Sequence, residues 1–474
     1  MSKILMVASE AAPYAKTGGL SDVVSSLPRA LTELGHQVAV LLPRYSDTAS
    51  FSMRRIWDNL PIPLGQKTFT ASVMQAEDDP TFLFLDIPEL YSRAGLYGDA
   101  AGDFPDNHLR FAALARGALE LARRIFLPDI LHCHDWQSGL LPLYQRQLAG
   151  DPTFADIPTV TTIHNLGYQG LFPASVLRQI GIDAAYFTPA GLEFYGQANF
   201  LKAGLVFSDW LTTVSRRYAE EIQTPEFGFG LDGLLLGRAK ELTGILNGAD
   251  YTRWNPETDN LIPAKYSAHS MGGKQKCKAE LLREFRLPGD MKTPLIGIVS
   301  RFTSQKGCDL IAAAAPQLFA EESFNLVALG SGEPAYENLF RELAAQYPNR
   351  VGLRIGYDDA LAHRIEAGAD MFLMPSLYEP CGLNQMYSLR YGTVPIVRAT
   401  GGLDDTIEHE TGYKFVRYSS DGLRKSVHDA MAGFRNQKSW QTMVSTGMSR
   451  DFSWAFSARQ YDKLYQSLLN PAAL

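Results

Sequence analysis

The chain of 474 residues contains only four cysteines, and they lie far apart in the sequence: Cys133, Cys277, Cys308 and Cys381. No two of them form a CxxC pair, which argues against a disulfide framework and against a zinc site of the usual spacing. His132 and His134 flank Cys133, but successive residues of a strand face opposite ways, so the cysteine and the histidines could not easily share a metal. We therefore expect a reducing compartment and no bound metal.

Long apolar runs, low-complexity tracts and an excess of basic residues are also missing. No stretch reaches the roughly 18 consecutive apolar residues of a membrane span, and the opening run Ile4 to Ala8 is too short for a secretion signal. The formal net charge of -7 argues against nucleic acid and anionic membranes as partners, because both bind positively charged surfaces. We therefore expect a cytoplasmic protein.

The chain contains 46% hydrophobic and 20% charged residues. This composition is typical of a fully folded globular protein. The length exceeds what one hydrophobic core usually serves, so we expect two domains. Short β-branched and apolar runs alternate with longer amphipathic stretches from end to end. This alternation is typical of α/β domains in which helices cover both faces of a parallel sheet.

Two series of predicted strands can be distinguished, each interspersed with predicted helices. The first series comprises residues 4–9, 37–42, 82–85, 129–134, 159–163 and 211–214, with a helix from about Asp22. The second comprises residues 294–300, 324–329, 352–355, 371–374 and 394–397. We place the domain boundary near Thr243 to Asp250 and predict a last helix from Trp454 to Leu469.

The residues that follow each strand are the site candidates, because open α/β sheets bind ligands beyond the carboxyl ends of their strands. After the first strand, the segment Lys16 to Leu20 carries paired glycines, Gly18 and Gly19, just before a helix. Close backbone approach, a helix N-terminus and the charge of Lys16 favour a bound phosphate. A flexible turn with a solvated lysine would show the same residue pattern, so this interpretation also stays open. The glycine spacings of a Walker loop and of a dinucleotide-binding fingerprint are absent from this segment.

Three later strands of the first half are followed by polar residues: Asp135 and Trp136, then His164 and Asn165, then Ser215. We expect these residues to line one rim of the sheet. Carboxylates and amides bind hydroxyls, and an aromatic face can cover the apolar side of a sugar ring, so such a rim suits a carbohydrate. For His132 a packing role in the core is the better interpretation.

In the second half, Arg301 and Lys306 lie in a segment that runs from a strand into a helix. A guanidinium fork and a compact ammonium group can together bind a diphosphate. Tyr357 follows a later strand and could stack on a purine. Glu379 follows another strand, between turn residues, where a carboxylate can bind sugar or ribose hydroxyls. These residues indicate a two-domain enzyme that binds a nucleotide diphosphate and a polyhydroxylic compound.

Segments spread over essentially the whole chain resemble the family of bacterial glycogen synthases and plant starch synthases. The most specific pair is Lys16-Thr17-Gly18-Gly19-Leu20 and Glu379-Pro380-Cys381-Gly382-Leu383. Further blocks occur in the order of the family: His132 to Trp136, Ile163 to Asn165, Leu201 to Gly204, Leu246 to Gly248, Ser300 to Gly307 and Gly401 to Leu403.

The resemblance implies an α/β fold of the GT-B class, with two doubly wound Rossmann-like domains whose parallel sheets face each other across a deep cleft. Residues 1–244 would form the glucan acceptor side and residues 245–456 the nucleotide-sugar donor side, with a helix at 457–474 that crosses back. The implied reaction is retaining transfer of glucose from ADP-glucose to the non-reducing 4-OH end of an α-1,4-glucan, with release of ADP, in glycogen biosynthesis. The implied partners are ADP-glucose and glucan, without a cofactor or metal.

The resemblance also implies roles for individual residues. The implied catalytic residues are Asp135, His164, Arg301, Lys306 and Glu379. The implied donor-binding residues are Lys16, Gly18, Gly19, Asp22, Asn247, Tyr357, Cys381, Gly382 and Leu383. Trp136 and Asn165 are implied to bind the acceptor. No carboxylate can be named as a covalent nucleophile, so our working hypothesis is attack by the acceptor on the same face, with the leaving phosphate taking its proton.

Three other interpretations stay open. The chain could be another enzyme of this fold that uses UDP- or GDP-sugars for a smaller acceptor, or a non-catalytic glucan-binding protein. A phosphorylase is disfavoured, because no lysine context suggests a pyridoxal site and the chain is short for that family. One departure from the family concerns the segment Thr406 to Tyr413, which is shorter than the insert of many bacterial members and could alter the outer edge of the donor pocket.

Overall fold

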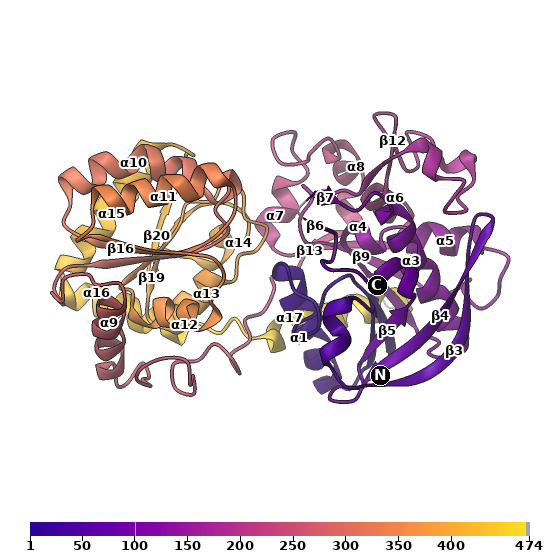
Figure 1. Ribbon diagram of the computed structural model, residues 1–474, viewed down its shortest axis with the longest axis horizontal. Helices are drawn as coiled ribbons and strands as arrows, with labels where there is room; N and C mark the ends of the chain where they lie inside the picture. Colours follow the sequence, from indigo (N-terminus) through magenta and orange to yellow (C-terminus); the bar gives the residue numbers. More distant parts are fainter. Residues whose placement is uncertain (100, 471–474) are drawn as a thin grey trace. The chain divides into compact units, whose positions relative to one another are not determined.

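The computed structural model describes residues 1–99 and 101–470 and divides into two compact α/β units (Figure 1). The first unit comprises Met1–Val214, Ala219–Gly248 and the C-terminal segment from Trp454, and the second comprises Ser215–Tyr218 and Ala249–Ser453. The first unit thus continues a few residues beyond the expected boundary at residue 244. The helix expected at 457–474 belongs to the first unit, and its residues 471–474 lie outside the described residues.

The first unit contains a nine-stranded sheet with the strand order β14-β13-β9-β8-β1-β2-β5-β4-β3. Each strand predicted for this half is present: β1 (Lys3–Val7), β2 (Gln37–Pro43), β5 (Phe82–Asp86), β8 (Ile130–His134), β9 (Thr159–Ile163) and β13 (Trp210–Thr213). These strands pair in parallel with one another. The predicted parallel α/β architecture is therefore confirmed for this unit.

The structure adds strands that the predicted series lacks. At one edge, β3 (Met53–Leu64) and β4 (Lys67–Ala76) form an antiparallel hairpin, and β14 (Leu242–Gly244) lies at the other edge. Because β3 is outermost, it tolerates Pro61 and Pro63, which cannot donate a ladder hydrogen bond. Short strands complete the unit: β6 (Gly98–Asp99), β7 (Gly102–Asp103), β10 (Leu171–Pro173), β11 (Glu193–Phe194) and β12 (Gln197–Asn199).

Helices cover both faces of this sheet. Ile4 and Met6 of β1 pack into one core with α1 (Gly19–Glu33) and α17 (Trp454–Leu469). Leu5 and Val7 pack into a second core with α3 (Asn107–Arg124). Burial on both sides explains why β1 is a continuous apolar run rather than an alternating one. The other helices are α2 (Pro88–Tyr91), α4 (Asp135–Ser138), α5 (Leu141–Gln147), α6 (Phe200–Phe207) and α8 (Asp232–Gly237), and α7 (Arg216–Glu221) begins in the second unit and ends in the first.

The second unit contains a six-stranded parallel sheet with the order β17-β16-β15-β18-β19-β20. The predicted strands correspond to β15 (Leu295–Val299), β16 (Asn325–Gly330), β17 (Val351–Ile355), β18 (Met371–Met374) and β19 (Val394–Arg398), and β20 (Tyr413–Phe415) is an added edge. Helices α10 (Cys308–Glu321), α11 (Pro334–Gln346) and α15 (Ser420–Arg435) pack on one face, and α9 (Gly272–Glu284) and α12 (Asp359–Gly368) on the other. The remaining helices are α13 (Asn384–Arg390), α14 (Gly401–Thr406) and α16 (Gln437–Ser449).

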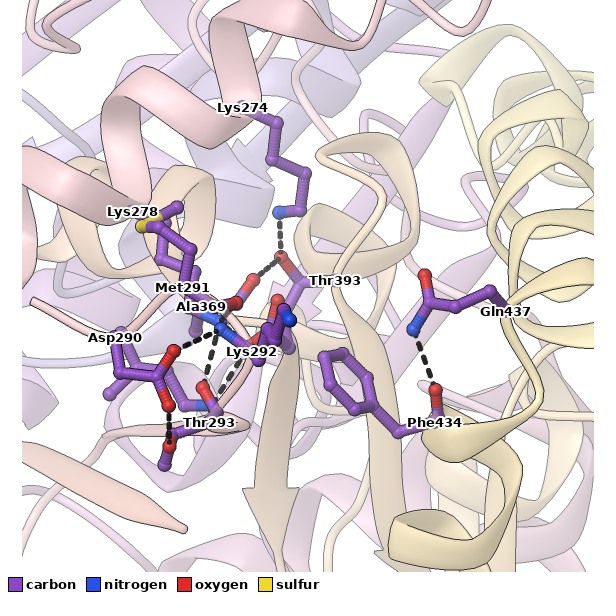
Figure 2. A network of polar contacts seen from close by, with 12 residues as sticks. Lys274, Lys278, Asp290, Met291, Lys292, Thr293, Ala369, Thr393, Phe434 and Gln437 are labelled. Atoms are coloured by element: carbon purple, nitrogen blue, oxygen red, sulfur yellow. Dashed lines mark hydrogen bonds and ion pairs between the residues drawn. The ribbon is translucent and has the colours of Figure 1, made fainter.

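A network of buried polar contacts fixes the amino ends of strands in the second sheet (Figure 2). Nζ of Lys278 donates to the carbonyl groups of Met291 (3.0 Å) and Thr293 (2.9 Å) and lies 2.7 Å from a carboxylate oxygen of Asp370. Asp370 precedes β18 and accepts a hydrogen bond from the backbone N–H of Leu295, the first residue of β15, at 2.8 Å. This network holds the sheet at the end opposite to the predicted site residues.

In the described part of the chain, no helix combines the length and the apolar character needed to cross a bilayer. Within the same residues, no group of three or more His, Cys, Asp or Glu side chains could hold a metal ion. The four cysteines are free and buried.

Candidate active site

A buried carboxylate organises the glycine-containing loop between β1 and α1. Glu10 follows β1 and is only 3% exposed. Its carboxylate accepts hydrogen bonds from the backbone N–H groups of Thr17 (2.6 Å) and Gly18 (3.2 Å) and from the Thr17 hydroxyl (2.6 Å). The hydroxyl of Tyr97 donates to the same carboxylate. Glu10 therefore holds the loop in one conformation, a role that lies outside our predictions.

The two glycines of this loop border open space. Gly18 is the extended N-cap residue and Gly19 the first residue of α1, which therefore begins earlier than the Asp22 that we predict. A Cβ atom at either glycine would meet no atom within 4 Å. Nζ of Lys16 lies 2.8 Å from Oδ1 of Asp22, at the same end of the helix. Backbone N–H groups, the helix N-terminus and a lysine together suit the binding of an anion.

Asp135 links the carboxyl ends of two neighbouring strands. It follows β8 with a φ of 56°, in the left-handed region that is uncommon for a residue with a side chain. Its Oδ1 accepts a hydrogen bond from the backbone N–H of His164, after β9, at 2.7 Å. Burial raises the pKa of Asp135 to about 7, although backbone hydrogen bonds from His164 and Asn165 act to lower it. This carboxyl group therefore changes its charge near neutral pH.

The ring of His164 lies against that of His134, with Nε2 of the former 2.9 Å from Nδ1 of the latter. Burial lowers the pKa of His164 to about 3, so the ring is neutral at physiological pH. In His132 both ring nitrogens have partners: Nε2 lies 2.6 Å from the hydroxyl of Thr162, and Nδ1 lies 2.8 Å from that of Tyr465. The packing role expected for His132 is confirmed.

The two predicted acceptor-binding residues make contacts within the first unit. The ring of Trp136 packs against Phe111 with centroids 4.8 Å apart, and a Cβ atom at Gly170 would lie 2.3 Å from it. Oδ1 of Asn165 accepts a hydrogen bond from the backbone N–H of Gly167 at 3.0 Å. Both residues follow strands of the first sheet, and their role in binding an acceptor stays a prediction.

Asn247 presents an unsatisfied polar atom. The residue follows β14 and is 6% exposed, and its Oδ1 is buried with no hydrogen-bond partner among the described residues. A buried polar atom of this kind costs about 1–3 kcal/mol unless a water or ligand supplies the missing donor. Asn247 thus remains a candidate for contact with the donor.

In the second unit, an ion pair joins the segments that follow β15 and β18. Nζ of Lys306 lies 2.6 Å from Oε2 of Glu379, and their side chains are 19% and 7% exposed. The hydroxyl of Ser376 donates to the same oxygen at 2.9 Å. From the sequence we predict that Lys306 binds a phosphate and that Glu379 binds hydroxyl groups. In the structure the two side chains are in direct contact.

Glycines allow the segments around Glu379 to pack this closely. Gly307 has a φ of 75°, and a Cβ atom there would lie 2.2 Å from the carbonyl oxygen of Pro375. At Gly401, with a φ of 45°, a Cβ atom would lie 1.9 Å from the carbonyl oxygen of Glu379. The backbone N–H of Gly402 donates to that same oxygen at 3.2 Å. The first turn of α14 therefore supports the backbone of Glu379 directly.

The predicted donor-binding residues Cys381, Gly382 and Leu383 connect Glu379 to α13, for which Leu383 is the N-cap residue. Hydrogen bonds of Gln305 connect Arg301 to the segment that contains Glu379. Nη2 of Arg301 donates to Oε1 of Gln305 at 3.2 Å, and the Gln305 carbonyl accepts a hydrogen bond from the N–H of Leu377 at 2.9 Å. Arg301, Lys306 and Glu379 thus belong to one connected set of strand-end segments.

Two further strand-end residues lie at other positions of the second unit. Tyr357 follows the edge strand β17, is 79% exposed and has its hydroxyl 3.3 Å from Oδ1 of Asp359. Ser215, which we expect at the rim of the first sheet, belongs instead to the second unit, where its hydroxyl donates to the carbonyl of Pro380 at 2.6 Å.

The short segment after Thr406 closes as a turn in which the N–H of Glu408 donates to the Thr411 hydroxyl at 3.0 Å.

The sequence of the whole chain is similar to known glycosyltransferases. A family model described as starch synthase catalytic domain matches residues 3–237, and one described as glycosyl transferases group 1 matches residues 283–442. A glycogen synthase of Koribacter versatilis is 51% identical over 98% of this chain and 97% of its own length. The chain belongs to the glycogen synthase family. A glycogen synthase of Anaeromyxobacter dehalogenans is 48% identical over 98% of this chain and 99% of that protein.

A solved structure shares the fold of this glycogen synthase family member. The catalytic domain of starch synthase IV from Arabidopsis thaliana, bound to ADP and acarbose, matches with a TM-score of 0.91 and 33% identity over 99% of both chains. The protein is therefore a glycosyltransferase, and the predicted GT-B fold with Rossmann-like α/β domains is confirmed.

Some residues that shape the site in this glycogen synthase family member lie outside our predictions. Glu10 stands shortly after β1, so the rule that selects residues beyond strand ends could have found it. Ser376 similarly follows β18, within a segment that we single out only for Glu379. Tyr97 has no such signal, because it contacts Glu10 from a loop far away in the sequence.

Proposed function

We propose that this member of the glycogen synthase family transfers glucose from ADP-glucose to the non-reducing 4-OH end of an α-1,4-glucan, retaining the α configuration and releasing ADP. The observation that carries the proposal is the connected set of Arg301, Lys306 and Glu379 at the strand ends of the second unit. Two cations beside one carboxylate suit a diphosphate that is attached to a sugar. The relatives named glycogen synthase support a glucan acceptor, and the starch synthase bound to ADP supports an adenine nucleotide.

The cationic side chains give the proposal its chemistry. When the bond between C1 of glucose and ADP breaks, negative charge develops on the departing phosphate. In our proposal Arg301 and Lys306 stabilise this charge, with help from Lys16 in the glycine loop. Because side chains supply the positive charge, we further propose that the transfer needs no metal ion. The exposed ring of Tyr357 would stack on the adenine.

Glu379 and His164 would hold the glucosyl group. Both contacts of the Glu379 carboxylate among the described residues use Oε2, which leaves Oε1 to accept a hydrogen bond from a glucose hydroxyl. We propose that the acceptor 4-OH attacks C1 on the face from which ADP leaves. A bond from C1 to the acceptor oxygen then forms as the bond to the phosphate oxygen breaks, and the acceptor proton passes to the phosphate.

The test is transfer of radiolabelled glucose from ADP-, UDP- and GDP-glucose to glycogen by the purified chain. We expect the highest kcat/KM with ADP-glucose, product that an α-1,4-specific hydrolase releases, and an unchanged rate in EDTA. A higher kcat/KM with UDP- or GDP-glucose would contradict the donor, and glycogen binding without transfer would indicate a glucan-binding protein instead. We also propose a cytoplasmic location, which the four free, buried thiols support.

A further inference from the structure

His134 places a second imidazole against the ring of His164 in the first unit. The two nitrogens that meet are Nδ1 of His134 and Nε2 of His164, 2.9 Å apart. Burial lowers the pKa of both rings, that of His164 to about 3, so at neutral pH each ring is uncharged and carries one proton. A hydrogen bond between two neutral imidazoles needs one donor and one acceptor. The pair therefore has only two possible proton arrangements.

The surroundings of His134 favour one of the two arrangements. Its other nitrogen, Nε2, is buried and has no hydrogen-bond partner in the described part of the chain. If His134 accepted at Nδ1, this Nε2 would carry the proton, and a buried N–H donor would be left unsatisfied. If His134 donates from Nδ1, Nε2 retains only a lone pair, which neighbouring C–H groups can partly stabilise. A protein interior offers many C–H groups but few free acceptors, so the second arrangement has the lower free energy.

Neighbouring residues hold the His134 ring in this orientation. The ring of His132 lies 4.3 Å away between centroids, and hydroxyl groups of Thr162 and Tyr465 fix His132 at both of its nitrogens. The hydroxyl of Ser138 bonds to the backbone of His134, accepting from its N–H at 2.7 Å and donating to its carbonyl at 2.9 Å. The proton arrangement is thus determined by the packing of β8 and β9 before any substrate binds.

We infer that His134 is a positioning residue that fixes His164 in the tautomer protonated on Nδ1, so that this nitrogen presents an N–H donor to a hydroxyl of the glucosyl group. The contact with glucose rests on the proposed function, whereas the tautomer does not. An imidazole free in water prefers its proton on Nε2, so without His134 the same nitrogen would become an acceptor. A neutral donor also binds a hydroxyl without adding positive charge beside the positive charge that develops on the sugar.

The tautomer can be measured directly in the unmodified protein. Two-bond 1H–15N correlation spectra of deuterated protein with 15N-labelled histidine rings distinguish a protonated nitrogen from a bare one. The signals are assigned by their absence from the variants His134→Asn and His164→Gln. We expect a protonated Nδ1 and a bare Nε2 on both His134 and His164. A bare Nδ1 on His164, or a charged ring at neutral pH, would overturn the inference.

Two substitutions at position 134 then separate the hydrogen bond from packing. His134→Asn retains an N–H donor near the position of Nδ1, and His134→Leu lacks one. We expect the Asn variant to keep Nδ1 of His164 protonated, with kcat within about threefold of wild type. In the Leu variant the proton should move to Nε2 and kcat should fall on the order of ten- to hundredfold, with a smaller change in the KM for ADP-glucose. The same His164 tautomer in both variants would contradict the inference.

His363→Leu provides a matched control, since it removes another fully buried histidine, from the second unit. It should lower stability without changing the His164 signals. If His134→Leu does not fold, the wild-type spectrum still decides the tautomer. If the tautomers follow our expectation but kcat does not fall in His134→Leu, the proposed contact of His164 with glucose is wrong while the tautomer assignment stands.

Discussion

Lys306 and Glu379 neutralise each other in the second unit, with Nζ of the lysine 2.6 Å from Oε2 of the glutamate. The lysine that we propose for the phosphate thus directly contacts the carboxylate that we propose for the sugar. A change at either residue will consequently alter both ends of the donor site. Kinetic effects of the two residues should therefore not be additive, because neighbours in one charge network are energetically coupled.

Lys306→Ala is expected to lower kcat by on the order of a hundredfold or more, because a cation at the departing phosphate is lost. Initial rates of glucose transfer measure the effect, and circular dichroism checks that the variant is folded. Lys438→Ala removes an exposed lysine from the same unit and should leave kcat unchanged. Unchanged turnover of Lys306→Ala with a raised KM for the donor would reject the charge-stabilising role.

Gly19→Ala is expected to leave stability unchanged or slightly higher, because the added methyl group meets no atom within 4 Å and alanine favours a helix. The methyl group would occupy space that we assign to the phosphate, so the KM for ADP-glucose should rise on the order of tenfold. Gly272→Ala is the matched control, since Gly272 also begins a helix and also borders open space. A wild-type KM in Gly19→Ala would show that no ligand approaches this side of the loop.

The stability of the first unit should decrease between about pH 4 and pH 7 through Asp135. Burial raises the pKa of this carboxyl group from 3.8 to about 7. Between these values the folded chain keeps a proton that the unfolded chain has released, so the contribution is complete below pH 3.8 and is lost as the pH rises through 7. Its upper bound is about 4 kcal/mol.

Asp135→Asn keeps a neutral group at this position at every pH and isolates the effect. The urea midpoint of the variant, relative to that of the wild type, should increase from pH 5 to pH 8. Other titrating groups are shared by both proteins and cancel in this comparison. A difference that does not vary with pH would mean that the Asp135 pKa is not raised.

Lys278→Met is expected to destabilise the second unit by about 3–5 kcal/mol, because it leaves Asp370 buried without its cation. Lys292→Met removes an exposed lysine from the adjoining segment (Figure 2) and should change stability by less than about 0.5 kcal/mol. Urea unfolding followed by circular dichroism measures both. Since Lys278 acts at the amino ends of the strands, kcat of the folded variant should stay near that of wild type, and a loss like that of Lys306→Ala would contradict this separation.

The parallel strands could be predicted because both of their faces are buried. In β1, Ile4 and Met6 enter one core while Leu5 and Val7 enter another, so the strand is apolar throughout. The hairpin of β3 and β4 could not be predicted in this way. It lies at the sheet edge, where Pro61 and Pro63 are tolerated and buried residues alternate with exposed ones, so the continuous apolar runs that mark the parallel strands are missing.

The positions of the candidate residues could be predicted better than their partners. The rule for strand ends selects Asp135, His164 and Glu379 without knowledge of side-chain directions. The contact of Lys306 with Glu379 spans 73 residues of sequence, and it depends on the close packing that Gly307 allows. Such contacts depend on how the loops at the strand ends pack against one another in the folded protein. The local sequence pattern of each loop does not contain this information.

The place of α17 in the first unit affects how the protein is made. Trp454, Tyr461 and Tyr465 enter the same core as Ile4 and Met6, although the ribosome adds them only after the entire second unit. While the second unit is being made, the first unit must therefore carry an uncovered apolar surface. Synthesis of α17, rather than emergence of the first sheet, is the step after which the first unit can complete its interior.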